Sequence, residues 1–514
     1  MLTDAPDSPA PDCNAIVVGA GLGGLAAAMR LGAKGYRVTV VDRLDTPGGR
    51  GSSLTKGGHR FDLGPTIVTF PALFEDLWAA CGRDFHADVD LRPMDPFYEI
   101  RWPDGSRFEA SGDTERMIEQ VRKLSPRDVT GYLRFLKGSK ARYEVGFERL
   151  GRIPMHNIME TVKVLPAFAR LRADRSILGL AKAHVRDPRL QMALSFHPLF
   201  IGGDPMHVTS MYALVSHLEK EFGVHYAIGG VQAIADAMAK IVRSQGGTVR
   251  LQTEVDEIVL DKGRAAGVRL ASGETLPASL VVSNADAGHT YSRLLRNHPR
   301  KRWTDSHLDR RRWSMGLFVW YFGTRGTRDM WRDIGHHTII NGPRYEGLLR
   351  DIFLRGHLSD DMSLYLHRPS VTEPGVAPDG GDTFYALSPV PHLGWDDPVD
   401  WAMECERYRQ KVAAVLEQHI PGFETHLSAS HILTPADFET RYLSPHGCGF
   451  SIEPRILQSA WFRPHNVSEE AEGLYLAGAG THPGAGLPGV VASAEVLVGM
   501  IPPVRAVQLP MAAE

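Results

Sequence analysis

Three glycines and one aspartate near the start of the chain have the types and spacing that bind a dinucleotide. Gly19, Gly21 and Gly24 directly follow the apolar run at 15–18, and Asp42 ends a second apolar run about 20 residues further on. In such a turn the first glycine permits the tight bend, the second lets the backbone approach a pyrophosphate, and the third lets helix and strand pack closely. The following helix directs free N–H groups at the phosphates, and the carboxylate accepts hydrogen bonds from ribose hydroxyls. These residues therefore predict a dinucleotide site.

A second group of residues extends this site along the chain. The segment at 43–50 ends in two glycines and an arginine, which can wrap another face of the pyrophosphate and add a charge-assisted contact. The segment at 62–66 offers a further close-packed turn where a flat flavin ring could lie. The candidate cofactor-binding residues of these two segments are Arg43, Gly48, Gly49, Arg50, Gly64, Pro65 and Thr66.

The elements that must position these residues form a β-α-β unit. Short apolar runs at 15–18 and 38–41 are typical of parallel strands buried on both faces, and the Ala- and Leu-rich segment between them predicts a helix. Residues 113–224 carry Arg, Glu, Leu and Met at helical spacing, which predicts a mostly helical insertion. Strand-like alternation returns from residue 247 onwards. The chain is therefore expected to be α/β, with α+β character overall.

Motifs spread over the chain resemble those of one family. The segments at 458–466 (QSAWFRPHN) and 478–490 (GAGTHPGAGLPGV) are similar to the flavin-binding signature of bacterial-type phytoene desaturases, in the FAD-dependent amine oxidase and carotenoid desaturase superfamily. The ribose-binding acid, often Glu in that family, is Asp42 here, and either carboxylate can accept the two hydrogen bonds. Further matching motifs, in the family's order, are SFHPLFIGG at 195–203, WYFG at 320–323, HHT at 336–338, LYLH at 364–367 and PVPHLG at 389–394.

The resemblance implies FAD as cofactor and a Rossmann-like FAD-binding domain that is discontinuous in sequence. Val255, Gly480, Gly489 and Val490 complete the expected FAD contacts. The expected division is a disordered leader at 1–13, an FAD-binding domain at 14–84, 225–290 and 456–514, a mixed-sheet substrate domain at 85–112 and 291–455, and a helical membrane-facing insertion at 113–224.

The glycine-rich segment near the C-terminus agrees with this expectation. The glycines between Gly478 and Gly489 let the backbone come close to a flat ring. A helix that begins near Gly489 would aim its N-terminus at the flavin pyrimidine and stabilise the reduced, anionic form. His482 lies in this segment, where a structural hydrogen bond and a catalytic role are the two alternatives.

The resemblance also implies a reaction, the FAD-dependent dehydrogenation of phytoene to carotenes at the neurosporene or lycopene level. A hydride would pass to flavin N5 and a proton would leave the adjacent carbon. Because a polyene hydrocarbon offers no charged group, we expect a long apolar tunnel with polar groups only near the flavin. Oxygen or a membrane quinone is the expected terminal acceptor. Alternatives are a desaturase of a later carotenoid such as hydroxyneurosporene, a flavin-dependent carotene isomerase, an amine oxidase, and a non-enzymatic escort of prenylated proteins.

Three residues are candidates for moving the proton. Glu160 and Lys163 lie one helical turn apart in a largely apolar stretch, where a carboxylate in an apolar pocket would have a raised pKa. The alternative is an exposed ion pair, which contributes a few tenths of a kcal/mol. His197 is the third candidate, and its alternative is a packed, hydrogen-bonded core histidine.

Composition and charge restrict the partners. Lys plus Arg number 57 against 60 Asp plus Glu, a net charge of −3, which disfavours a nucleic-acid binder. The four cysteines form no CxxC pair, and neither a secretory signal nor a spanning segment is evident, so we expect a cytoplasmic protein. No metal site is expected, because His336 and His337 lack an HxxxH or carboxylate cluster.

The expected substrate dissolves only in bilayers, so we expect peripheral association with the cytoplasmic membrane. The basic run at 300–313, which contains Trp303 and Trp313, is either a solvated face or a surface that docks on anionic lipid.

Overall fold

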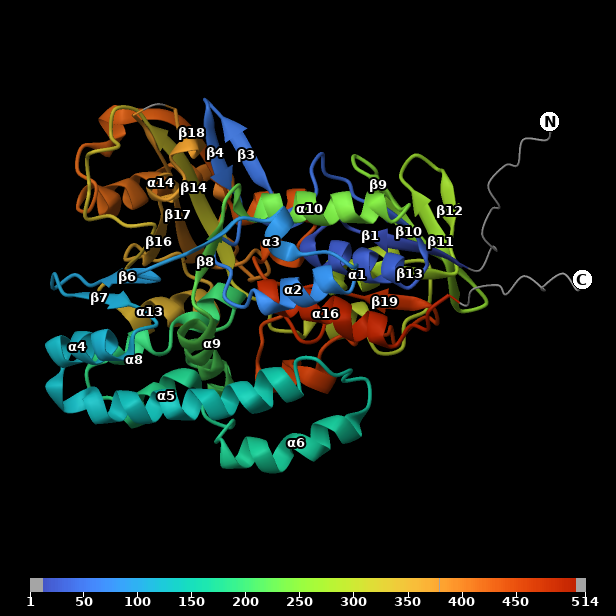
Figure 1. Ribbon diagram of the computed structural model, residues 1–514, viewed down its shortest axis with the longest axis horizontal. Coiled ribbons are helices and arrows are strands. Elements are labelled where there is room, and N and C mark those ends of the chain that lie inside the picture. Colours follow the sequence, from blue (N-terminus) through green and yellow to red (C-terminus); the bar gives the residue numbers. More distant parts are fainter. Residues whose placement is uncertain (1–12, 379, 505–514) are drawn as a thin grey trace, which may run out of the picture.

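A computed structural model describes residues 13–378 and 380–504. Except for Cys13, the expected leader lies outside the described residues. Figure 1 shows two sheet-containing regions at opposite ends of the long axis, with a layer of helices that runs along one side of both. Of the helices that the structure describes, none is long and apolar enough to cross a bilayer.

A five-stranded parallel sheet organises the first region. Its strands are short and apolar because both faces are covered, and β1 pairs with β2 so that Val17 lies opposite Val40. In spatial order the strands are β19 (Leu474–Leu476), β13 (Leu280–Ser283), β1 (Asn14–Val18), β2 (Arg37–Val41) and β9 (Thr248–Arg250).

Helices and a second sheet cover the two faces of this parallel sheet. Val17 and Val40 point into a core shared with α1 (Leu22–Ala33), α10 (Gly230–Ser244) and α16 (Leu487–Gly499). Ile16 and Val281 point into a core on the other face. That core is shared with the antiparallel strands β10 (Val255–Asp261), β11 (Arg264–Leu270) and β12 (Thr275–Pro277).

A seven-stranded mixed sheet organises the second region. All its neighbours are antiparallel except β15 and β6, and β14 alternates Phe318 and Trp320 towards one core with Val319 and Tyr321 towards the other. The order is β18 (Leu427–Leu433), β14 (Gly316–Thr324), β17 (Asp382–Val390), β16 (Leu364–His367), β15 (His337–Ile340), β6 (Tyr98–Arg101) and β7 (Arg107–Ala110). Two small sheets pair β3 (Ser53–Lys56) with β4 (His59–Asp62), and β5 (Leu91–Pro93) with β8 (His225–Ala227).

Helices fill the remaining chain, and one of them stands apart. None of the residues of α6 (Ile158–Arg170) is buried, and Figure 1 shows α6 at the outer edge of the helical layer. The helices before β8 are α2 (Ala72–Ala79), α3 (Phe85–Asp88), α4 (Thr114–Leu124), α5 (Val129–Tyr143), α7 (Ile177–His184), α8 (Pro188–Ala193) and α9 (Leu214–Phe222). The later ones are α11 (Ala287–His289), α12 (Asp305–Asp309), α13 (Tyr345–Arg350), α14 (Trp401–Glu417) and α15 (Pro435–Tyr442). The domain boundaries expected from the sequence stay a prediction.

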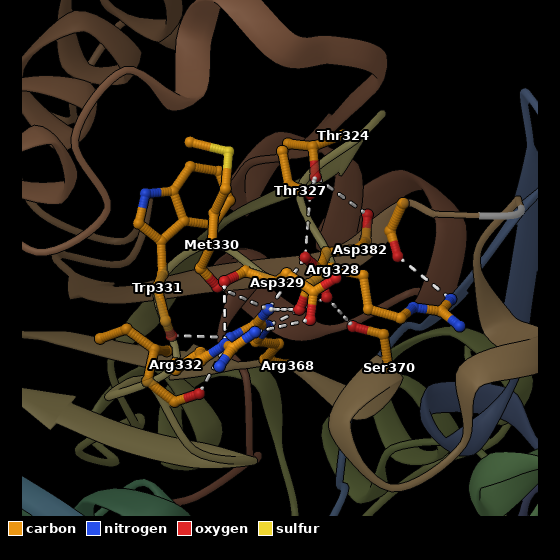
Figure 2. Close-up of polar contacts among 12 residues, drawn as sticks. Thr324, Thr327, Arg328, Asp329, Met330, Trp331, Arg332, Arg368, Ser370 and Asp382 are labelled. Atoms are coloured by element: carbon orange, nitrogen blue, oxygen red, sulfur yellow. Dashed lines mark hydrogen bonds and ion pairs between the residues drawn. The ribbon is translucent and has the colours of Figure 1, made fainter.

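A buried ion pair joins the end of β16 to the start of β17, two interior strands of the seven-stranded sheet (Figure 2). Arg368, directly after β16, donates from Nε and Nη2 to the two carboxylate oxygens of Asp382 at 3.0 and 2.9 Å. Ser370 and Thr327 donate to the same carboxylate, and the remaining guanidinium N–H groups donate to backbone carbonyls. Every charged atom of this pair therefore has a partner, which a buried ion pair requires.

Candidate active site

A cavity of ≈ 860 Å³ runs between the two regions. At one end it is lined by Gly19, Gly21 and Asp42, and at the other by apolar side chains that include Ile158 and Leu165 of α6. A volume of this size is at the upper end of the range for ligand sites. The cavity therefore joins the expected dinucleotide turn to a long apolar chamber.

The turn between β1 and α1 has the geometry that the glycine spacing predicts. Gly19 adopts a φ of +100°, and a Cβ on Gly24 would lie 2.1 Å from the carbonyl oxygen of Gly19. Gly21 forms the N-cap of α1 without a side-chain hydrogen bond, so the first N–H groups of the helix stay free for an anion.

Asp42 is fixed at the wall of the cavity by two backbone donors. Its carboxylate accepts hydrogen bonds from the N–H of Ala20 at 2.6 Å and of Leu44 at 2.8 Å. Burial nevertheless raises the pKa of Asp42 above its ordinary value, because desolvation outweighs these bonds. The carboxylate keeps lone pairs that can accept hydrogen bonds from ribose hydroxyls.

The turn at 63–66 is held by three tyrosines of the seven-stranded sheet. Tyr321 donates to the carbonyl of Leu63 at 3.0 Å, and Tyr385 donates to that of Gly64 at 3.1 Å. The hydroxyl of Tyr365 lies 2.8 Å from Oγ1 of Thr66. A Cβ on Gly64 would lie 2.0 Å from the carbonyl oxygen of Arg50, so the turn packs directly against the expected pyrophosphate segment.

Most of the expected cofactor residues line this cavity. Gly24 and Gly480 lie behind its wall, where a Cβ would collide with neighbouring backbone. Arg43 reaches the cavity, but its guanidinium donates to the carbonyls of Thr440 and Arg441 at 2.6 and 2.9 Å. The lining residues are Gly19, Gly21, Asp42, Arg43, Gly48, Gly49, Arg50, Gly64, Pro65, Thr66, Val255, Gly489 and Val490.

The C-terminal glycine segment closes the cavity from the opposite side. Helix α16 begins at Leu487, two residues before the expected start at Gly489. The Nε2 atom of His482 lies 2.9 Å from the carbonyl oxygen of Leu150, and burial lowers the pKa of His482 to about 4. This contact is the structural hydrogen bond that the sequence offered as one of two alternatives.

These residues fit FAD. The glycine cradle leaves no room for side chains at Gly24 and Gly64, the helix N-terminus suits a pyrophosphate, and Asp42 suits a diol. The elongated cavity continues past this cradle, as a long cofactor with a substrate beside it requires. FAD bound there would accept a hydride from a substrate in the apolar chamber.

The three catalytic candidates occupy different surroundings. Lys163 and Glu160 form an i,i+3 ion pair at 2.7 Å on α6, with side chains 65% and 32% exposed. This is the exposed pair that the sequence offered as the alternative, although a catalytic role stays an untested prediction. His197 lines the cavity and is buried, with Nε2 at 3.1 Å from both Oε2 of Glu219 and the hydroxyl of Tyr98.

Sequence reasoning missed the partners of His197. Glu219 and Tyr98 lie 22 and 99 residues away along the chain, on α9 and β6. The charged stretch around Glu219 is typical of an exposed helix face, yet Glu219 itself is 6% exposed. No local spacing could have indicated this contact.

Comparisons with known proteins identify the family of this chain. Residues 22–495 match the family model of flavin containing amine oxidoreductases. A phytoene desaturase (neurosporene-forming) from Cereibacter sphaeroides is 67% identical, over 96% of each chain. A phytoene desaturase (lycopene-forming) from Paracoccus sp. is 42% identical, over 94% of this chain and 95% of the relative.

Solved structures show the same fold at low identity. A putrescine oxidase bound to putrescine has a TM-score of 0.62 at 16% identity and covers 95% of this chain, with 98% of its own length matched. An oxidoreductase from Methanosarcina mazei has a TM-score of 0.64 at 17% identity and also covers 95% of this chain, with 100% of its own length matched. The chain therefore belongs to the flavin-containing amine oxidoreductases and, within them, to the bacterial phytoene desaturases, and it is an FAD-dependent oxidoreductase.

Proposed function

We propose that this chain dehydrogenates phytoene to more conjugated carotenes at the neurosporene or lycopene level. The observation that carries the proposal is the single cavity that joins the FAD cradle to an apolar chamber. The names of the relatives favour phytoene over a later carotenoid and over isomerisation. The five-stranded sheet would act as the Rossmann-like part of a discontinuous FAD domain. Oxygen or a membrane quinone is proposed as terminal acceptor.

The walls of the apolar chamber would align the polyene and exclude water. Leu199, Phe200 and Leu317 line it together with the three tyrosines that hold the turn at 63–66. The hydroxyls of these tyrosines form hydrogen bonds with that turn, so the tyrosines contact the cavity with their aromatic rings. A hydrocarbon buried against such walls gains free energy in proportion to its apolar area.

We assign His197 the role of proton acceptor. Glu219 accepts hydrogen bonds from both Nε2 of His197 and the hydroxyl of Tyr98, which leaves Nδ1 of His197 as the basic nitrogen. Nδ1 is buried and has no hydrogen-bond partner among the described residues. A histidine held by a carboxylate through one ring nitrogen is an arrangement used for general bases.

Single-turnover reduction of the flavin tests this assignment. His197→Gln is expected to slow bleaching of FAD by phytoene-loaded liposomes by about 10²–10⁴-fold, with FAD content retained. Glu160→Gln serves as the matched comparison and is expected to retain the wild-type rate. If Glu160→Gln is slow and His197→Gln is not, the assignment passes to Glu160 and Lys163. If wild type fails to bleach with phytoene at all, the proposed substrate is wrong.

We further propose that α6 docks the mouth of the cavity on the membrane surface. Ile158, Met159, Val162 and Leu165 are 40–53% exposed, and three of the four also line the cavity. Such a helix can lie in the interface with its apolar face among the lipids. A hydrocarbon could then enter the chamber directly from the bilayer.

The basic run at 300–313 is a weaker docking candidate. Trp303 and Trp313 are 0% and 6% exposed, so neither ring can reach a headgroup layer. Arg300 also pairs with Asp305 at 2.9 Å, which removes part of the charge.

Co-sedimentation with anionic liposomes tests the role of α6. The double variant Met159→Glu/Leu165→Glu is expected to reduce binding by at least about tenfold, because two charges enter the apolar interface. The matched control is Met403→Glu on α14, where the methionine is 72% exposed. Unchanged binding of the double variant, or an equal loss in the control, would contradict docking through α6.

A further inference from the structure

Three histidines meet in the core of the seven-stranded sheet, outside the cavity. The antiparallel register of β15 and β16 places His337 opposite His367, and His336 directly precedes β15. Their ring centroids lie 4.4 to 5.3 Å apart, and one ligand atom from each lies within 4.8 Å of the others. The three side chains are 5%, 2% and 1% exposed. The cluster is therefore buried and close-packed.

Each of these histidines has one ring nitrogen held by a neighbour. Nδ1 of His336 lies 2.6 Å from Oγ1 of Thr372, and Nδ1 of His337 lies 2.6 Å from the hydroxyl of Tyr365. Nε2 of His367 lies 3.4 Å from Oδ2 of Asp62. Hydroxyl and carboxylate partners of this kind fix the tautomer and orientation of metal-binding imidazoles.

The other ring nitrogen of each histidine has no partner among the described residues. These atoms are Nε2 of His336, Nε2 of His337 and Nδ1 of His367, all fully buried. Buried polar atoms in native proteins are nearly always satisfied, so three such atoms in one cluster require an explanation. Each imidazole can offer this nitrogen to a metal ion as a lone pair when the nitrogen held by its neighbour carries the proton.

The cluster also adjoins a buried carboxylate, that of Asp62. Asp62 is 4% exposed, its Oδ1 has no partner among the described residues, and its contact with His367 is long. The guanidinium of Arg60 lies near this carboxylate and donates two hydrogen bonds to Glu373, at 3.1 and 2.9 Å. Three clustered imidazoles beside a buried carboxylate are groups that can hold a cation.

We propose that His336, His337 and His367 bind a divalent transition-metal ion of the zinc class. Imidazole nitrogens suit zinc and its neighbours in the series, whereas magnesium and calcium prefer oxygen ligands. Asp62 would contact His367 rather than the ion, orient its ring and balance part of the positive charge of the ion. Nitrogens on a tetrahedral zinc ion lie about 3.3 Å apart, so ligand atoms within 4.8 Å of one another would have to approach by at most about 1.5 Å. The ion would tie β15 and β16 to the turn at 63–66 through Tyr365 and Thr66.

Metal analysis of the FAD-loaded full chain, purified without a metal-affinity step, tests the site. Wild type is expected to carry or take up about one equivalent of Zn²⁺. After chelator treatment, Co²⁺ should give the d–d absorption of a low-coordinate site in the difference spectrum. The variant His336→Gln removes one ligand and leaves Asp62 and His367 in contact. It is expected to weaken Zn²⁺ and Co²⁺ binding at least about tenfold.

His59, a buried histidine outside the cluster, provides the matched control. His59 is 0% exposed, and both of its ring nitrogens are partnered, by Thr383 at 2.9 Å and Ser428 at 2.8 Å. His59→Gln should therefore bind the metal as wild type does. The site is overturned if wild type binds neither ion saturably, or if His336→Gln binds as tightly as His59→Gln. Neither readout depends on phytoene turnover, so failure here leaves the proposed function untouched.

Discussion

Two buried polar clusters of the seven-stranded sheet, one of histidines and one around an arginine, contain consecutive residues of the chain. They differ in how many of their polar atoms have hydrogen-bond partners. His367 ends β16 and belongs to the histidine cluster, whereas the next residue, Arg368, pairs with Asp382 (Figure 2). In the arginine cluster every charged atom is partnered within the chain. In the histidine cluster three ring nitrogens and one carboxylate oxygen have no partner in the part of the chain that the structure describes. The first cluster is therefore complete by itself, and the second is the one for which we propose a metal ion.

The largest expected effect comes from breaking the complete cluster. Arg368→Met leaves the carboxylate of Asp382 buried, with Ser370 and Thr327 as its remaining side-chain donors among the described residues. Removing one partner of a buried pair costs about 3–5 kcal/mol, because an uncompensated charge stays in the interior. Denaturation of the FAD-loaded protein in guanidinium should show this loss.

The double variant Arg368→Met/Asp382→Leu distinguishes charge from packing. It removes both charges and keeps apolar volume, so it should recover most of the stability that Arg368→Met loses. A double variant no more stable than the single one would mean that the loss comes from packing.

An intermediate loss of folding stability is expected when the metal-free protein is acidified, because the histidine cluster must then bind protons. Burial and the neighbouring histidines hold the pKa values of His336 and His337 well below the ordinary value, so both are neutral in the folded chain. The unfolded chain binds protons below pH of about 6.5, so the folded state keeps its stability above that pH and loses it as the pH falls. Each histidine contributes up to about 1.4 kcal/mol per pH unit.

The variant His337→Phe isolates one of these titrations. Tyr365 keeps its contact with Thr66 when the imidazole is replaced, so no hydroxyl is stranded. Thermal melts of chelator-treated protein from pH 7 to pH 5 should fall less steeply for His337→Phe than for wild type. Parallel curves would mean that His337 is protonated in the folded chain or exposed on acidification.

Local pattern predicted the dinucleotide turn because its residues are neighbours in sequence. Gly19, Gly21 and Gly24 are read directly from their spacing, and the conformation at Gly19 and the packing at Gly24 agree with that reading. The position of Asp42 could also be predicted, because the second strand of a β-α-β unit ends about 20 residues after the glycine-rich turn. The turn at 63–66 was also visible in the sequence, although the tyrosines that hold it were not.

Contacts made by sheet register and by insertion helices could not be predicted in the same way. The pair at His336 and His337 gave no metal signal because its third member, His367, lies 30 residues from His337 and arrives through strand pairing. Glu219 reaches His197 because α9 buries one acidic residue of a charged helix. In both cases the partner is chosen by tertiary packing, which single-sequence spacing does not encode.

The smallest expected effect is the one that separates the two clusters most sharply. In metal-free protein, His336→Phe replaces an imidazole that has one unpartnered nitrogen and loses only the contact with Thr372. Removing a buried polar atom that has no partner is nearly neutral, so the change should alter unfolding free energy by less than about 1 kcal/mol. With Zn²⁺ at 100 times its Kd, wild type should gain about 2.7 kcal/mol and the variant should gain far less. A loss in metal-free His336→Phe as large as that of Arg368→Met would instead mean that the histidine cluster is already complete, since only a partnered group costs that much to remove.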